Sequence, residues 1–205
     1  MEYSHPIFTF LIVINRKQNV INGKIMRIKA SETIGAVIDV QERLFPHIHQ
    51  KDDLAGAIKK MIDGFKVLEV PLILTQQYTK GLGNTIPDIA QELPEMDYIE
   101  KKRFSCCGVS QFDDMLGNAP YRNVVLMGIE THVCVLQTAI DLVEQGYQPI
   151  VVADAVSSRE YEDHEIALRR LQQEGVLLTT VESLLFELTV EAGSEEFKKI
   201  SRIVK

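Results

Sequence analysis

The stretch N-V-V-L-M-G-I-E-T-H-V-C-V-L-Q-T-A, residues 123–139, joins an apolar run to an amphipathic segment through Gly128. Residues 123–127 are predicted to form a strand, and the apolar spacing of residues 132–145 predicts a helix that ends at Gly146. A buried strand followed by a turn and an amphipathic helix is the repeating unit of a parallel sheet. This stretch therefore favours an α/β fold.

The same alternation continues on both sides of this stretch. Further strands are expected at 34–40, 71–75, 97–100, 149–153 and 176–180. Further helices are expected at 54–67, 109–116, 163–174, 183–188 and 195–203, with a polar loop at 76–94. The pattern predicts a doubly wound, Rossmann-like and mostly parallel sheet with helices on both faces.

The chain reads as one domain, because it has no internal repeat and no low-complexity linker. Residues 1–25 lack the periodicity of the rest and are interpreted as an N-terminal extension, with Met26 as an alternative natural start. The competing interpretation is an extra edge strand at Phe8–Ile14. The expected domain is 26–205.

The composition excludes several classes of protein. A formal net charge of −7 disfavours nucleic acid and anionic membranes as partners, since both attract basic surfaces. The 3 cysteines are too few, and odd in number, for a secreted disulfide framework. No apolar run approaches the roughly 18 residues of a membrane span, and no export signal is evident. A cytoplasmic protein with reduced thiols is expected.

Cys134 is the first candidate catalytic residue. If Thr131 caps the helix, Cys134 lies in its first turn, where free amides and the helix dipole favour a thiolate and lower the pKa of the thiol. The alternative is a small buried apolar residue, as free cysteines often are.

Two charged residues follow other strands. Asp39 lies in the apolar run A-V-I-D-V-Q near its carboxyl end, where a buried charge needs a partner or a role. The segment E-K-K-R-F-S, residues 100–105, follows the third expected strand. In a doubly wound sheet the end of the first strand meets the Cys134 turn at one crevice, and the end of the third strand lies two strands from the first, about 10 Å away, a gap that a lysine side chain can largely span. The alternatives are a turn-capping Asp39 and a solvated lysine face.

Together, I-D-V-Q, K-K-R-F-S and G-I-E-T-H-V-C-V-L-Q-T-A resemble the Asp, Lys and Cys motifs of the isochorismatase-like hydrolases. The spacing to Ser105 selects Lys101 rather than Lys102. The segments D-V-Q-E-R-L-F-P and T-Q-Q-Y-T-K-G-L-G resemble the isochorismatase domain-containing branch. The resemblance implies a thiol hydrolase of a small amide or related acyl compound, with Asp39, Lys101 and Cys134 as its triad. It also implies a homo-oligomer.

The resemblance further implies that the backbone amides of Glu130 and Cys134 bind the oxyanion and that the Ile129–Glu130 peptide is cis. Walls of a small pocket are expected from the loops after the first two strands, namely Gln41, Phe45, Gln77 and Tyr78.

The chain also departs from its relatives. Nicotinamidases of the superfamily carry a D-x-H metal motif where this chain has Gln76, Gln77 and Tyr78. Amides and a phenol are poor ligands for zinc or iron, so neither a catalytic metal nor any other cofactor is expected. Two rival functions stay open, a cysteine-independent ether hydrolase that needs Asp39 alone and a non-catalytic scaffold.

The remaining histidines and cysteines are interpreted as structural. His47 and His49 are assigned to a surface loop, and His132 to the helix face turned away from Cys134. Cys106 and Cys107 lack a second pair at metal-ligand spacing and are expected in the core.

Overall fold

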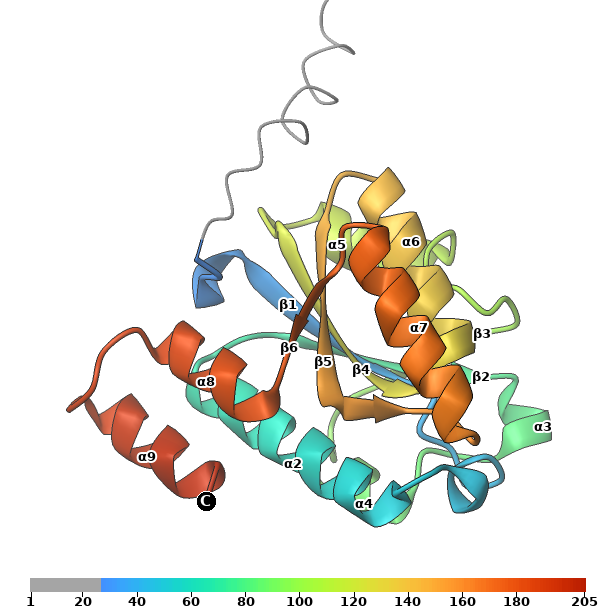
Figure 1. Cartoon of the computed structure of the whole chain (residues 1–205), viewed down its shortest axis with the longest axis horizontal. Coiled ribbons are helices and arrows are strands. Elements are labelled where there is room, and N and C mark those ends of the chain that lie inside the picture. Colours follow the sequence, from blue (N-terminus) through green and yellow to red (C-terminus); the bar gives the residue numbers. More distant parts are fainter. Residues whose placement is uncertain (1–26) are drawn as a thin grey trace, which may run out of the picture.

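The computed structural model describes residues 27–205, and the possible strand at Phe8–Ile14 lies outside them. The strands are β1 (Thr33–Ile38), β2 (Leu72–Gln77), β3 (Tyr98–Lys101), β4 (Asn123–Ile129), β5 (Gln148–Ser157) and β6 (Leu177–Thr179). All pair in parallel in the order β3-β2-β1-β4-β5-β6 (Figure 1). The doubly wound sheet predicted from the sequence is confirmed.

Helices cover both faces of the sheet (Figure 1). The α-helices are α2 (Lys51–Val67), α3 (Thr79–Leu82), α4 (Pro87–Ala90), α5 (Ser110–Gly117), α6 (Leu136–Glu144), α7 (Tyr161–Gln173), α8 (Val181–Thr189) and α9 (Glu195–Ile203). The other helical turns are η2 (Ala30–Glu32), η3 (Phe45–His47) and η4 (Thr131–Val135). The loop expected at 76–94 thus contains two short helices.

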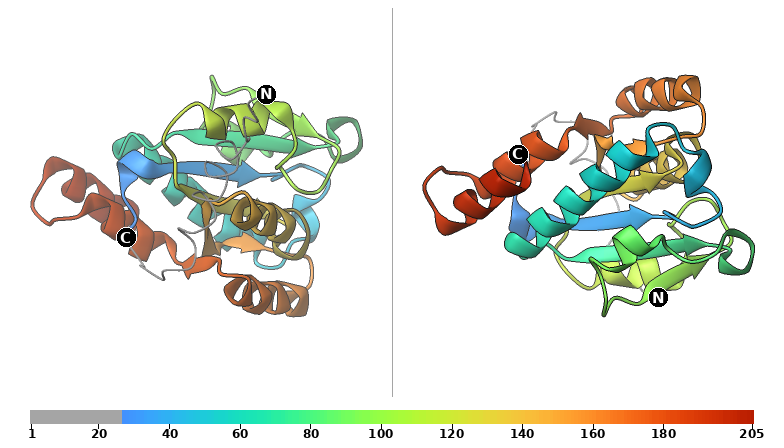
Figure 2. Two further views of the ribbon diagram at one scale, coloured as in Figure 1. Left: turned by 90° about the horizontal axis from the view of Figure 1, so that it is seen from above. Right: turned by 90° about the horizontal axis from the view of Figure 1, so that it is seen from below.

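The core has one half on each face of the sheet. Helices α2, α8 and α9 contribute Ile58, Leu184 and Ile200 to one half. Helices α5 and α6 contribute Phe112 and Ala139 to the other. Figure 2 shows α8 and α9 side by side at one flank of the sheet. Because helices cover both faces of the sheet, the sequences of the inner strands are continuous apolar runs, and every residue of β1 is buried.

Gly128 sets the contact between the two central strands. It pairs with Ile38 in the β1–β4 register and has a φ of 117°. A Cβ atom at this position would lie 2.2 Å from the carbonyl oxygen of Ile38. Glycine is therefore required for β4 to approach β1 just before the chain reaches the Cys134 turn.

No helix within residues 27–205 is both long and apolar enough to cross a membrane.

Candidate active site

The three predicted residues lie at the carboxyl edge of the sheet, where its order reverses between β1 and β4. Asp39 directly follows β1, Lys101 is the last residue of β3, and Cys134 lies in η4, directly after β4. A ligand crevice is expected at this point of a doubly wound sheet. Parallel pairing therefore brings together residues that are far apart in the chain.

Asp39 and Lys101 form a buried ion pair. The Lys101 Nζ lies 2.5 Å from Asp39 Oδ2, with 0% and 1% of the two side chains exposed. The Thr75 hydroxyl donates to the other carboxylate oxygen, Asp39 Oδ1, at 2.8 Å. Both oxygens are thus held, which compensates for burial of the charge.

The Lys101 ammonium has further oxygen acceptors around it. It donates to Gln77 Oε1 at 2.8 Å and to the carbonyl of Phe104 at 2.9 Å, and the carbonyl of Arg103 lies at 3.4 Å. Burial alone lowers the pKa of Lys101, but the charge of Asp39, with smaller contributions from Cys134, from Cys106 and from the hydrogen bond to Asp39, raises it, and the net pKa is raised. Lys101 is therefore a fixed cation.

Cys134 adjoins this pair as a buried thiol, 7% exposed. Burial raises its pKa, and the charge of Asp39 and a hydrogen bond to Asp39 raise it further, against the lowering effect of Lys101. The lowered pKa expected from the sequence is therefore wrong. Desolvation and a neighbouring carboxylate outweigh the helix terminus, so the resting group is a thiol beside a base.

The turn that carries Cys134 differs from the predicted helix start. Residues 131–135 form a π-helical turn whose N-cap position is Glu130, not Thr131, with no capping hydrogen bond from its side chain, and α6 follows. The carbonyl of Glu130 accepts hydrogen bonds from the amides of Val133 at 3.1 Å and Val135 at 3.2 Å. The peptide between Ile129 and Glu130 is cis, as expected.

Two threonines that sequence reasoning missed hold the site together. Thr75 fixes Asp39, as described above. The Thr138 hydroxyl donates to the carbonyl of Cys134 at 2.6 Å and accepts from the amide of Cys106 at 3.0 Å. Thr138 therefore connects the turn that carries Cys134 to the loop after β3. Threonine within an apolar run gives no sequence signal for such a role.

The four expected pocket residues differ in what they contact. The Gln41 amide is buried and bonds to the backbone of Gln77 and to the carbonyl of Gly83. The Gln77 side chain accepts a hydrogen bond from Lys101 and donates one to the carbonyl of Lys102. Phe45 is half-buried against the core, whereas Tyr78 is 48% exposed. The two glutamines thus bind the protein itself, which leaves Phe45 and Tyr78 as candidate walls.

The other histidines and cysteines occupy structural positions. His132 Nδ1 lies 2.8 Å from Ser158 Oγ, and His132 Nε2 lies 3.7 Å from Asp163 Oδ2. Cys106 and Cys107 are buried in the core, although the charges of Lys101 and Asp39 also affect the pKa of the Cys106 thiol. Within residues 27–205, no three or more His, Cys, Asp or Glu side chains are grouped to hold a metal ion.

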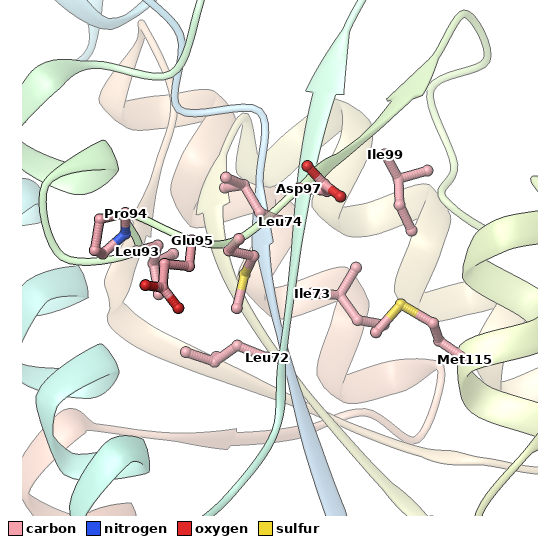
Figure 3. A pocket seen from close by; sticks show the side chains of 10 residues that line it. Leu72, Ile73, Leu74, Leu93, Pro94, Glu95, Asp97, Ile99 and Met115 are labelled. Atoms are coloured by element: carbon pink, nitrogen blue, oxygen red, sulfur yellow. The ribbon is translucent and has the colours of Figure 1, made fainter.

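An apolar groove of about 610 Å³ lies elsewhere, where β2 extends beyond its pairing with β3 (Figure 3). Its walls include Leu72 and Leu74 together with Ile73 and Met115 (Figure 3). None of the triad residues lines it. It is therefore separate from the ion pair and the thiol.

The chain matches the isochorismatase domain over residues 34–183. It is 40% identical over 173 residues to the secreted isochorismatase effector Isc1 of Phytophthora sojae, covering 82% of each chain. The MAR1 ribonuclease structure from Caenorhabditis elegans superposes with a TM-score of 0.82 at 37% identity, covering 87% of this chain and 92% of that one.

The octameric hydrolase of unknown specificity encoded by ycaC in Escherichia coli shares the fold, with a TM-score of 0.76 at 22% identity. The superposition covers 81% of this chain and 83% of the Escherichia coli protein.

Proposed function

The chain belongs to the isochorismatase family, and from that premise we propose that it hydrolyses a small amide or related acyl compound with Cys134 as its nucleophile. The observation that carries this proposal is the buried cluster in which Asp39 pairs with Lys101 and the Cys134 thiol lies close enough for both charges to affect its pKa. A nucleophile in contact with a base that is itself oriented by a third group is the arrangement of covalent hydrolases.

In the proposed reaction, Asp39 takes the thiol proton as Cys134 attacks the carbonyl carbon of the substrate. The carbonyl oxygen becomes an oxyanion, which the backbone amides of Glu130 and Cys134 bind. Protonated Asp39 then donates to the leaving amine, and a thioester forms as the C–N bond breaks. Water, deprotonated by Asp39, hydrolyses the thioester and releases the carboxylic acid and free thiol.

Lys101 has a positional and electrostatic role in this mechanism. With its three protons directed at protein oxygens and its pKa raised, it does not exchange protons with the substrate. Its charge instead stabilises the thiolate that forms as Asp39 becomes neutral. The proton therefore moves between Cys134, Asp39 and the substrate alone.

Substrate size follows from the surroundings of the thiol. Cys134 is only 7% exposed and the expected walls include Phe45 and Tyr78, which suits a small, partly apolar compound. The worm relative is called a ribonuclease, but a net charge of −7 opposes binding of RNA, whose phosphates require basic surface. We therefore favour a small acyl substrate.

Further parts of the proposal concern the protein as a whole. We expect residues 26–205 to form the hydrolase domain, residues 1–25 to be an extension, and the protein to act in the cytoplasm as a homo-oligomer. Catalysis is proposed to need no metal and no other cofactor, since no step requires one. Turnover should then survive treatment with a chelator, and loss of activity that zinc, iron or manganese restores would contradict this.

The experiment that tests the function is detection of an acyl adduct. The protein is incubated with a panel of small amides and esters, and the adduct is located by mass spectrometry of peptides. An adduct on Cys134 is expected, and Cys134→Ala should abolish both adduct and turnover, whereas Cys107→Ala should retain both.

Two outcomes would favour the rivals. Turnover retained by Cys134→Ala but lost in Asp39→Asn would indicate an ether hydrolase. Wild-type protein that forms no adduct and turns over no compound of either class would favour a scaffold.

A further inference from the structure

Three consecutive residues, Glu130 to His132, are hydrogen-bonded to the β5–α7 connection and the first turn of α7. Glu130 Oε1 accepts hydrogen bonds from the backbone amide and the Nε of Arg159, at 3.1 and 3.0 Å. Thr131 Oγ1 lies 3.0 Å from His164 Nδ1, and His132 Nδ1 lies 2.8 Å from Ser158 Oγ. The chain entering the Cys134 turn is thus held residue by residue.

Strand pairing explains why Arg159 reaches Glu130. Ile129 and Ser157 are the last paired residues of β4 and β5, so the chain segments that continue from them run side by side. The Glu130 side chain is 7% exposed and that of Arg159 is 55% exposed. A nearly buried carboxylate therefore depends on the guanidinium group of a surface arginine for its side-chain partner.

The charge of Glu130 matters because its own backbone amide is the proposed oxyanion donor. An unneutralised carboxylate on that residue would oppose the negative charge that develops on the substrate oxygen. Arg159 cancels this charge and fixes the side chain through two donors that converge on one oxygen. Both effects act on the transition state and not on the thiol itself.

We propose that Arg159 is a positioning residue for the oxyanion site, acting through Glu130. This inference rests on the proposed function, because it takes the Glu130 amide as an oxyanion donor. It assigns to an exposed arginine outside the triad a part in the attack on a carbonyl group.

The test compares two reagents that react with the same sulfur atom. With 4-nitrophenyl acetate, the thiolate attacks the acetyl carbonyl, the S–C bond forms, and 4-nitrophenolate leaves through an oxyanion intermediate. With iodoacetamide, the thiolate displaces iodide at a saturated carbon and no oxyanion forms. Rates at Cys134 are followed by mass spectrometry, and the ratio of acetylation to alkylation reports on the oxyanion site alone.

Arg159→Ala should lower the acetylation rate of Cys134 about tenfold, less than the 10²–10³-fold caused by losing an oxyanion donor outright, and should change alkylation by less than about twofold. Arg170→Ala is the matched control, since Arg170 is 56% exposed and also pairs with a glutamate, Glu174, at the end of α7. It should change neither rate. Thermal melts establish that all variants are folded.

A mutant cycle locates the effect on Glu130. In a Glu130→Gln background, Arg159→Ala should change the ratio by less than about twofold, because no carboxylate is left to hold or neutralise. A ratio unchanged in Arg159→Ala, a parallel fall in both rates, or an undiminished effect in the Glu130→Gln background would each overturn the inference. Failure of the proposed function is distinct, since the acetyl group would then remain on wild-type Cys134 without hydrolysis.

Discussion

Asp39 is the residue on which the candidate site depends, and its backbone is unusual. It has a φ of 53°, a left-handed conformation that aspartate tolerates better than most residues. The amide of Asp39 donates to the carbonyl of Thr75 at 3.3 Å, while the Thr75 hydroxyl donates to its carboxylate. The strand end therefore holds the carboxylate against Thr75 and Lys101.

Replacing Asp39 by Asn should separate thiol acidity from catalysis. The pKa of Cys134 is raised by burial and then by the charge of Asp39, so removing that charge lowers the pKa and increases the thiolate fraction at about pH 8. Alkylation of Cys134 by iodoacetamide should become faster than in the wild type, while hydrolysis falls about 10²–10⁴-fold without its acid/base group. Slower alkylation together with normal hydrolysis would refute the assigned role.

Lys101 and its neighbour Lys102 offer a matched pair for stability. Lys101→Met leaves the Asp39 carboxylate buried without its cation, which should cost about 3–5 kcal/mol of unfolding free energy. Lys102 is exposed, and Lys102→Met should stay within about 0.5 kcal/mol of the wild type. Urea denaturation followed by circular dichroism measures both, and equal midpoints for the two variants would contradict the buried pair.

At this scale the sequence predicts the charged residues better than their surroundings. Asp39 and Cys134 stand out because a charge or a thiol lies at the end of an apolar strand, whereas Lys101 is selected only by the resemblance to the family motif that ends at Ser105. Thr75, Thr138 and Arg159 give no such signal, since threonines and surface arginines are common in any chain. The sign of the Cys134 pKa shift depends on burial and on Asp39, which only the folded structure brings to the thiol.

Among the elements, β1 and β4 are the two central strands of the sheet, and Gly128 tests the contact between them. Gly128→Ala places a methyl group against the Ile38 carbonyl at a φ that disfavours side chains, and should cost about 3 kcal/mol and most of the activity. A methyl group added at Gly56 in α2 would meet no atom within 4 Å, so Gly56→Ala should be neutral or stabilising by up to about 1 kcal/mol. Thermal unfolding distinguishes the two, and a tolerated Gly128→Ala would contradict the register.

Strands and long helices are predictable because burial imposes their periodicity. The helices α3 and α4 are not, since each has only four residues and is held by distant contacts. Arg43 Nη1 donates to the carbonyl of Gly81, and Gln41 Nε2 donates to that of Gly83. The π-helical turn at Cys134 likewise cannot be predicted from the sequence, because its residues have ordinary helical spacing.

At the scale of the whole molecule, the alternation of strands and helices predicts the sheet order. Right-handed crossovers allow few ways to cover both faces, and the reversal between β1 and β4 is the commonest. The crevice at that reversal is therefore predictable from sequence, whereas the groove beside β2 is not, because it arises where β3 happens to be short.

The central place of β1 also affects how the protein is synthesised. Translation delivers β2 soon after β1, but β4, the other neighbour of β1, begins only at Asn123. Until then the growing chain presents an apolar strand edge that can pair with another nascent chain. We expect ribosome-bound chains stalled just before Asn123 to be captured by chaperones more than chains stalled well beyond Ile129, and equal capture would contradict this. Thus the strand pairing that assembles the site also leaves the nascent chain prone to intermolecular strand pairing until β4 has emerged.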